Sequence, residues 1–143
     1  MFRYLFVLLS LFMAACTTPY ARQGDALNGN IFIGTHYGYD DKPLGDDRYW
    51  VSYRGNLQTD TPHIRIYERL RLRAAQVTMA SGHKYFVIEK QTETLEPNAT
   101  APKDLLLEAT IRVMDSPEGV AKNMRVFEAE PTLHTGEGSY LFH

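Results

Sequence analysis

The chain has 143 residues, of which 44% are hydrophobic and 22% are charged. This length and composition are typical of one globular domain, and they exclude a fibrous or disordered chain. The 15 basic and 17 acidic side chains give a formal net charge of −2, so the basic excess of nucleic-acid-binding proteins is absent and no nucleic-acid partner is expected. A single cysteine excludes an internal disulfide bond and a zinc site built from several thiolates.

Residues 1–15 have the layout of an export signal. Arg3 supplies one positive charge, an apolar run follows, and two alanines precede Cys16. The apolar run is about 12 residues long, whereas a helix that spans a bilayer needs about 20, so a retained transmembrane anchor is disfavoured. Residues 13–16, Met-Ala-Ala-Cys, resemble the lipobox of bacterial lipoproteins. This resemblance implies that Cys16 is acylated and becomes the first residue of the mature protein.

Lipidation of Cys16 competes with a simpler interpretation, in which the thiol lies by chance beside an ordinary signal-peptidase site. Lipidation is favoured because the export signal ends at this cysteine. Several acyl chains would anchor the protein almost permanently, since each buried methylene contributes about 0.8 kcal/mol. Thr17 follows the cysteine, and by resemblance to enterobacterial sorting the absence of aspartate there favours the outer membrane, facing the periplasm. Residues 16–28 then predict a flexible tether, and residues 29–143 a single domain.

A β-hairpin is expected at the start of this domain. Residues 48–54, RYWVSYR, alternate between two faces, as a half-buried strand requires. Residues 31–39 are rich in aromatic and β-branched side chains and predict the preceding strand. The turn between the two strands is expected within residues 40–47, DDKPLGDD.

The strongest helical pattern covers residues 61–82. Thr61 suits the N-cap, Pro62 suits the first helical position, and Gly82 suits the stop. At about 100° per residue, a wide apolar arc and a narrow basic face lie on opposite sides of this helix. The apolar arc comprises Ile66, Tyr67, Leu70, Ala74, Val77 and Thr78. The arc predicts packing on a sheet, and its width predicts that a second surface also covers part of the helix.

The remaining elements are expected to complete the sheet. Residues 85–88, YFVI, predict a central strand whose polar continuation leads toward solvent. Residues 105–114 alternate and predict a strand antiparallel to it. Residues 116–118 are compatible with a helix start, but residues 124–129 alternate, so we expect a strand there and a short helix that begins at Pro131. The expected fold class is α+β, a mostly antiparallel sheet with one long α-helix packed on one face.

Three sequence blocks resemble a known protein family. They are YWVSYRGN at residues 49–56, RAAQVT at residues 73–78 and GHKYFVI at residues 82–88. In this order behind a lipobox, they look like the core of a group of small Gram-negative outer-membrane or periplasmic lipoproteins of uncharacterised function. The match extends over residues 38–88 and is moderately specific. The resemblance implies an α+β envelope lipoprotein, and it implies no catalytic residues because none is established for the family.

Arg65, Arg69 and Arg73 are the candidate partner-binding residues. They recur at every fourth position of the predicted helix and form a basic stripe that could bind phosphate groups, an acidic glycan or an acidic protein. The alternative is a solvated helix face whose charge is balanced by nearby carboxylates.

Other combinations of polar residues point to no metal, cofactor or reaction. The aspartates at 40, 41, 46 and 47 lack the spacing of a calcium loop and are interpreted as turn residues. The histidines are His36, His63, His83, His134 and His143. Their spacing predicts no metal site, and the glycines show no nucleotide-binding pattern. No nucleophile has the surroundings that catalysis requires, so no enzymatic activity is expected.

Two functions are compatible with these patterns. The first is a lipid-anchored structural or adaptor lipoprotein that binds an envelope protein or a cell-wall polymer in the periplasm. The alternative is a periplasmic lipoprotein that binds a small ligand or a metal, which the aromatic strands and scattered histidines would allow. A hydrolase acting on the wall would need paired carboxylates in a groove.

Overall fold

In the described part of the chain, an antiparallel sheet is combined with two helices, which confirms the expected α+β class. The computed structural model describes residues 20–23, 37–57, 63–97, 104–135 and 139–141. The strands are β1 (Gly38–Gly45), β2 (Arg48–Asn56), β3 (Tyr85–Glu96), β4 (Asp104–Met114), β5 (Val126–Glu128) and β6 (Ser139–Leu141), and the helices are α2 (Ile64–Ala80) and α3 (Ala129–Thr135).

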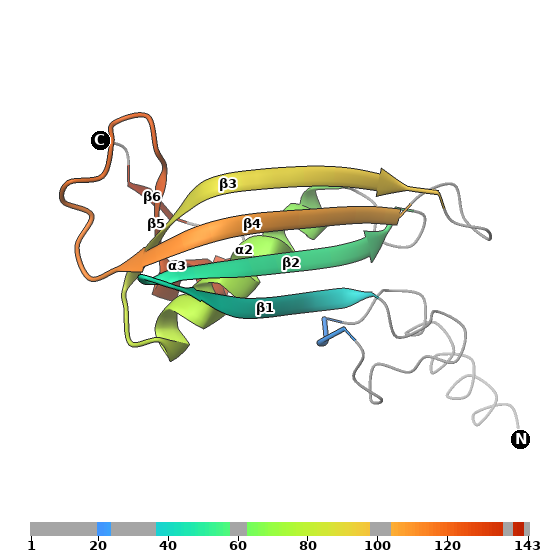
Figure 1. Cartoon of the computed structure of the whole chain (residues 1–143), viewed down its shortest axis with the longest axis horizontal. Coiled ribbons are helices and arrows are strands. Elements are labelled where there is room, and N and C mark those ends of the chain that lie inside the picture. Colours follow the sequence, from blue (N-terminus) through green and yellow to red (C-terminus); the bar gives the residue numbers. More distant parts are fainter. Residues whose placement is uncertain (1–19, 24–36, 58–62, 98–103, 136–138, 142–143) are drawn as a thin grey trace, which may run out of the picture.

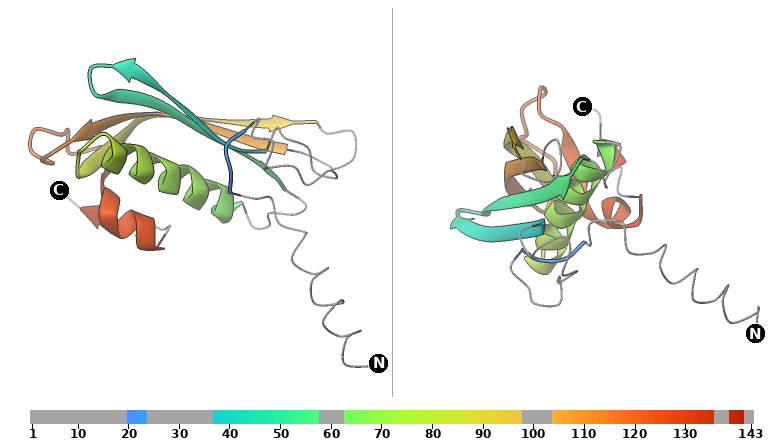
Figure 2. Two further views of the ribbon diagram at one scale, coloured as in Figure 1. Left: turned by 90° about the horizontal axis from the view of Figure 1, so that it is seen from below. Right: turned by 90° about the vertical axis from the view of Figure 1, so that its right-hand side faces the viewer.

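The six strands form one sheet in the order β1-β2-β4-β3-β5-β6. Every pair of neighbours is antiparallel. Figure 1 shows the four long strands side by side, and Figure 2 shows that α2 and α3 lie on the same side of the sheet. Within the described residues, no helix covers the opposite face, which we call the open face.

The hairpin of β1 and β2 is present, but its turn is shorter than expected. Only Asp46 and Asp47 separate the strands, and both have positive φ angles, 50° and 55°. Two consecutive residues of this conformation match the right-handed twist of paired strands, and aspartate tolerates the conformation better than most residues. Residues 40–45, which were predicted as turn, therefore belong to β1. The expected strand residues 31–36 lie outside the described part of the chain.

Helix α2 packs its apolar arc against the sheet. Its buried residues are Ile66, Leu70, Ala74, Ala75, Val77 and Thr78. Thr78 is compatible with this burial because its hydroxyl donates a hydrogen bond to the carbonyl oxygen of Ala74, at 2.7 Å. Gly82, with φ at +83°, follows the helix as predicted. The proposed cap residues Thr61 and Pro62 lie outside the described residues.

The core lies between the sheet and α2. Strand β4 contributes Leu105, Leu107, Ala109, Ile111 and Val113, all of which are buried as their alternation predicts. Tyr53 and Phe86, two of the strand aromatics, are fully buried. Strand β3 runs on to Glu96, so the polar continuation after Ile88 is part of the sheet.

The C-terminal part confirms the expected strand and short helix and adds one further strand. Strand β5 covers Val126–Glu128, and α3 begins at Ala129, two residues before Pro131. Helix α3 packs against α2, and this contact is the second surface that the wide apolar arc predicts. Strand β6 pairs with β5 and was not expected from the sequence.

Candidate functional site

The proposed export signal (residues 1–15), the proposed lipidation site Cys16, and residues 17–19 and 24–28 of the proposed tether lie outside the described residues. The tether's residues 20–23 contact the domain. The backbone amide of Tyr39 in β1 donates a hydrogen bond to the carbonyl oxygen of Ala21, at 2.9 Å. Tyr20 is packed against Tyr39, and burial raises the pKa of its hydroxyl. Neither helix in the described part of the chain combines the length and apolar character needed to cross a membrane.

The three arginines of the predicted basic stripe do not share one environment. Arg65 is exposed. Arg69 donates a hydrogen bond to the hydroxyl of Tyr53, and its guanidinium lies 5.5 Å from the centre of that ring. Arg73 donates to Asp41 Oδ1 through Nε at 2.9 Å and Nη2 at 2.7 Å. Two of the three side chains therefore join α2 to β1 and β2.

The aspartate cluster is likewise divided among structural roles. Asp41 forms an ion pair with Arg73, whereas Asp40 accepts a hydrogen bond from Arg22 at 3.2 Å. Asp46 and Asp47 form the hairpin turn. In the described residues, no three or more histidine, cysteine, aspartate or glutamate side chains come together as metal ligands would.

Charged side chains on the open face are mostly paired. The carboxylate of Glu89 accepts hydrogen bonds from Arg48 at 2.8 Å and from Arg112 at 2.9 Å. The hydrogen bond from Arg48 is the main reason why the pKa of Glu89 is lowered. Arg54 and Glu96 form a separate ion pair.

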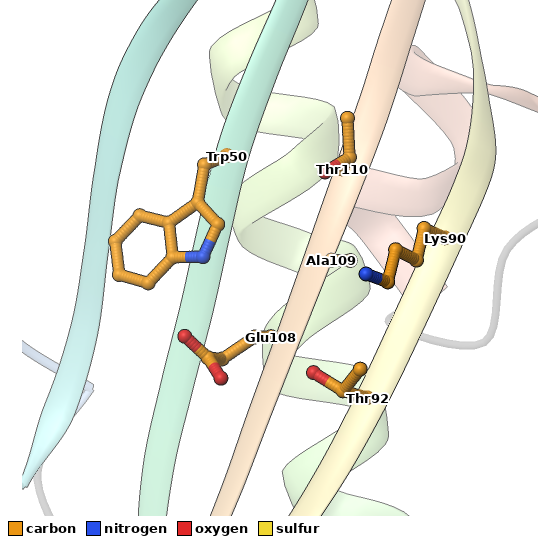
Figure 3. Close-up of a pocket in the computed structure, with 6 residues that line it drawn as sticks. All are labelled: Trp50, Lys90, Thr92, Glu108, Ala109 and Thr110. Carbon is orange, nitrogen blue, oxygen red and sulfur yellow. The ribbon is translucent and has the colours of Figure 1, made fainter.

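Two charged side chains without such a partner among the described residues, Lys90 and Glu108, line a shallow hollow on this face. We call it the open-face hollow. Its lining residues are Trp50, Lys90, Thr92, Glu108, Ala109 and Thr110, and its volume is about 200 Å³. Figure 3 shows Trp50 on one side and Lys90 reaching from β3 toward β4, with α2 behind the sheet. Strand pairing places Glu108 opposite Thr92 and Thr110 opposite Lys90. Lys90 and Glu108 form no hydrogen bond or ion pair with other described side chains.

Trp50 has one further neighbour at this site. Lys42, from the adjacent strand β1, lies with its Nζ 4.9 Å from the centre of the indole ring. The hollow thus combines an aromatic surface, one lysine ammonium group, one carboxylate and two threonine hydroxyls, and the ammonium group of Lys42 lies beside it. These groups can bind hydroxyl, amide and charged groups of a partner molecule.

A larger cavity, of about 550 Å³, lies between α2, β3 and the segment that precedes β5. We call it the arginine cavity, because Arg71 from α2 and Arg125 line it from different elements. Ile88, Met124 and Phe127 supply apolar surface. Its size is that of cavities that hold small ligands.

A buried polar cluster lies at the far end of β2 and β4. Tyr37 donates a hydrogen bond to Asp104 Oδ1 at 2.8 Å, and Asn56 Nδ2 donates to the same oxygen at 3.1 Å. All three residues are buried. The cluster connects residues up to 67 positions apart, and it joins β4 to the segment before β1.

None of these three sites follows from the sequence patterns. Alternation did place Trp50 on the face opposite Tyr49, and Glu108 on the face opposite Leu107. The hollow arises only because β4 lies between β2 and β3, and the strand order cannot be read from alternation. Comparison of the chain with protein-family models, with curated proteins and with solved structures finds no match.

Proposed function

We propose that the protein is a lipid-anchored envelope lipoprotein that acts as an adaptor in the periplasm. Acyl chains on Cys16 anchor it, in the outer membrane, and the following residues connect the anchor to the domain. The export signal, the lipobox resemblance and the three sequence blocks support this location. The partner is an envelope protein or a cell-wall polymer.

The observation that carries the adaptor role is the open-face hollow. Other charged groups on the open face form ion pairs: Glu89 binds Arg48 and Arg112, and Arg54 binds Glu96. Lys90 and Glu108 instead remain available beside Trp50. Aromatic side chains with adjacent polar groups are typical of surfaces that bind partners. The hollow is shallow, which suits an extended polymer or a protein surface better than an enclosed small molecule.

The anchor is tested by labelling cells with radioactive palmitate. The wild-type protein should incorporate label and fractionate with membranes, whereas Cys16→Ser should incorporate none and should lose the membrane association. A Thr17→Ser variant keeps the cysteine and serves as the matched control. Incorporation of label by Cys16→Ser would contradict the proposed attachment site.

The interface is tested by photo-crosslinking in intact cells. A crosslinking residue at Thr92, on the hollow, should capture one dominant partner, whereas the same residue at Met79, which is exposed on α2, should not. Removing both free charges, with Lys90→Gln and Glu108→Gln, should reduce capture about tenfold or more, because charged hydrogen bonds are lost. Lys122→Gln with Glu118→Gln removes the same charges from the exposed loop and is the control. Equal capture by both double variants would reject the hollow as the interface.

A second candidate function is the binding of a small ligand by a periplasmic lipoprotein. It is favoured by one observation, the arginine cavity, which is separate from the open-face hollow. The two functions are compatible in one protein because the two sites share no lining residue.

A further inference from the structure

Residues 20–23, which we call the strap, are bound to the edge of the sheet although they belong to the predicted tether (blue in Figure 1). Strand β1 is the first strand in the sheet order, so one of its sides faces no other strand of the sheet among the described residues. On this side, the amide of Tyr39 donates to the carbonyl oxygen of Ala21 at 2.9 Å, and the amide of Gln23 donates to that of Tyr39 at 2.7 Å. The strap is therefore a short parallel addition to the sheet.

The side chain of Tyr20 fixes the strap to both layers of the domain. Its ring lies against the rings of Tyr39 and Tyr53, with centroids 5.0 Å and 6.3 Å away. Its hydroxyl donates a hydrogen bond to Gln76 Oε1 on α2, at 2.8 Å. The strap is thus held by the sheet and by the helix at the same time.

The position of the strap in the sequence limits the distance between the proposed anchor and the domain. Tyr20 is the fourth residue after Cys16, and an extended chain of this length spans at most about 14 Å. Gly38, where β1 begins, is the 22nd residue after Cys16, and an extended chain of that length can span up to about 75 Å. The bound strap therefore shortens the longest possible distance from the membrane about fivefold.

The strap also decides which side of the domain lies near the lipid. It lies beside β1, whereas β5 is four strand positions away in the order β1-β2-β4-β3-β5-β6. Neighbouring strands are about 4.8 Å apart, so β5 lies about 19 Å from β1 across the sheet. The loop between β4 and β5, residues 115–125, lies at the end of the sheet away from the strap (Figures 1 and 2). This loop and β5 are the parts of the domain remote from the anchor.

We infer that the strap holds the domain against the membrane surface, with the β1 edge and the adjacent part of α2 toward the lipid head groups. The inference rests on the proposed acylation of Cys16. It restricts the adaptor to partners that come close to the membrane, since the anchoring segment cannot lengthen while the strap is bound. The open-face hollow is compatible with this placement, because its lining residues belong to β2, β3 and β4 and none belongs to β1.

The test uses the full, acylated chain in phosphatidylcholine vesicles that contain a trace of lipid with a fluorescent acceptor on its head group. Acylation occupies Cys16, so a cysteine that replaces an exposed lysine is the single free thiol for a donor dye. Lys42→Cys places the donor on β1, and Lys122→Cys places it on the remote loop. Energy transfer to the acceptor lipid should be stronger from position 42 than from position 122.

Two insertions of one flexible linker show whether the strap carries the connection to the anchor. A linker of about twelve glycine and serine residues spans about 20 Å on average. Inserted before the strap, between Thr18 and Pro19, it should lower the transfer from position 42 about twofold or more. Inserted after the strap, between Asn28 and Gly29, it should leave the transfer unchanged, because the bound strap bypasses that part of the chain.

Substitutions in the strap connect this difference to its contacts. Tyr20→Ser with Gln23→Pro removes the aromatic contact and one backbone donor, so the two insertions should then have the same effect. Arg22→Gln removes an exposed ion pair from the same segment and should preserve the difference, because such pairs contribute little. Thermal unfolding verifies that each variant is folded.

Three results would overturn the inference. They are equal effects of the two insertions in the wild-type strap, equal transfer from positions 42 and 122, and a difference between the insertions that persists in the folded Tyr20→Ser, Gln23→Pro variant. Failure of the proposed anchor has another signature: the protein would not bind the vesicles at all, which rejects acylation of Cys16 and the inference with it. Protein that binds the vesicles but gives one of the three results rejects the inference alone.

Discussion

Arg69 and Arg73 contact β2 and β1, although the helical pattern of the sequence predicts both on the face opposite the apolar arc. Their guanidinium groups lie over the rings of Tyr53 and Tyr39, at 5.5 Å and 4.2 Å from the ring centres. Arginine suits this position because its stem is apolar, its plane stacks on aromatic rings and its donors reach carboxylates. The basic face is therefore partly an internal contact between helix and sheet.

Removal of the charge of Arg73 should destabilise the protein. The Arg73–Asp41 pair is four-fifths buried, so Arg73→Gln leaves the carboxylate of Asp41 poorly compensated. We expect the free energy of unfolding to fall by about 1–3 kcal/mol, measured by urea denaturation. Arg65→Gln, in the exposed first turn of the same helix, should change it by less than about 0.5 kcal/mol. Equal effects of the two substitutions would show that Arg73 is only a solvated charge.

Glu89 should make stability depend on acid pH. Its pKa is lowered by hydrogen bonds from Arg48 and Arg112, so the folded state binds a proton less readily than the unfolded chain. The contribution is present above the unfolded glutamate pKa, about 4.3, and is lost as pH falls through the lower folded value. Glu89→Gln should lower the midpoint of thermal unfolding at pH 7 and reduce the loss on acidification. The exposed Glu118→Gln is the control, and its pH dependence should match that of the wild type.

The positive φ angle of Gly82 ends helix α2. Gly82 has φ at +83°, and its amide donates a hydrogen bond to the carbonyl oxygen of Met79 at 3.0 Å. A Cβ atom added at Gly82 would meet no atom within 4 Å, so Gly82→Ala adds backbone strain without a steric clash. We expect a loss of about 1 kcal/mol in the free energy of unfolding. Gly82→Asn, whose side chain tolerates positive φ better than that of alanine, should lose less stability; an equal loss in both variants would argue against strain at Gly82.

Strand β5 pairs with β3, helix α3 packs against α2, and an aromatic contact between Phe86 and Phe127 adds to this attachment. The rings of Phe86 and Phe127 stack with an interplanar angle of 9°. Phe127 is buried on the side of the sheet that the helices cover. Phe127→Ala should reduce the free energy of unfolding by about 3–5 kcal/mol, because a large buried side chain is lost. Hydrogen exchange should also quicken in residues 126–135 more than in β4. Met79→Ala, at a position 44% exposed, should change stability by less than about 0.5 kcal/mol.

At the scale of the whole molecule, the helices among the described residues cover one face of the sheet and leave the other face open. The covered face holds the core, and the open face holds ion pairs and the open-face hollow. An antiparallel sheet tolerates this asymmetry, since its strands can be apolar on one side and polar on the other. The open face gives the proposed adaptor a broad surface for a partner, whereas the arginine cavity lies on the face of the sheet that the helices cover.

Local patterns were enough to determine several elements of this protein. Each of these patterns involves residues that are close together in the chain. They correctly predict the buried side of β4 from residues 105–114, the buried side of α2 from its apolar arc, and the end of α2 at Gly82. The proposed anchor at Cys16 also comes from the sequence alone and stays a prediction. Tertiary structure decided the strand order, the burial of Arg69 and Arg73, and the positions of the hollow and the cavity. The physical reason is that periodicity tells which way a side chain points around its own helix or strand, whereas its partner depends on which distant segment packs there.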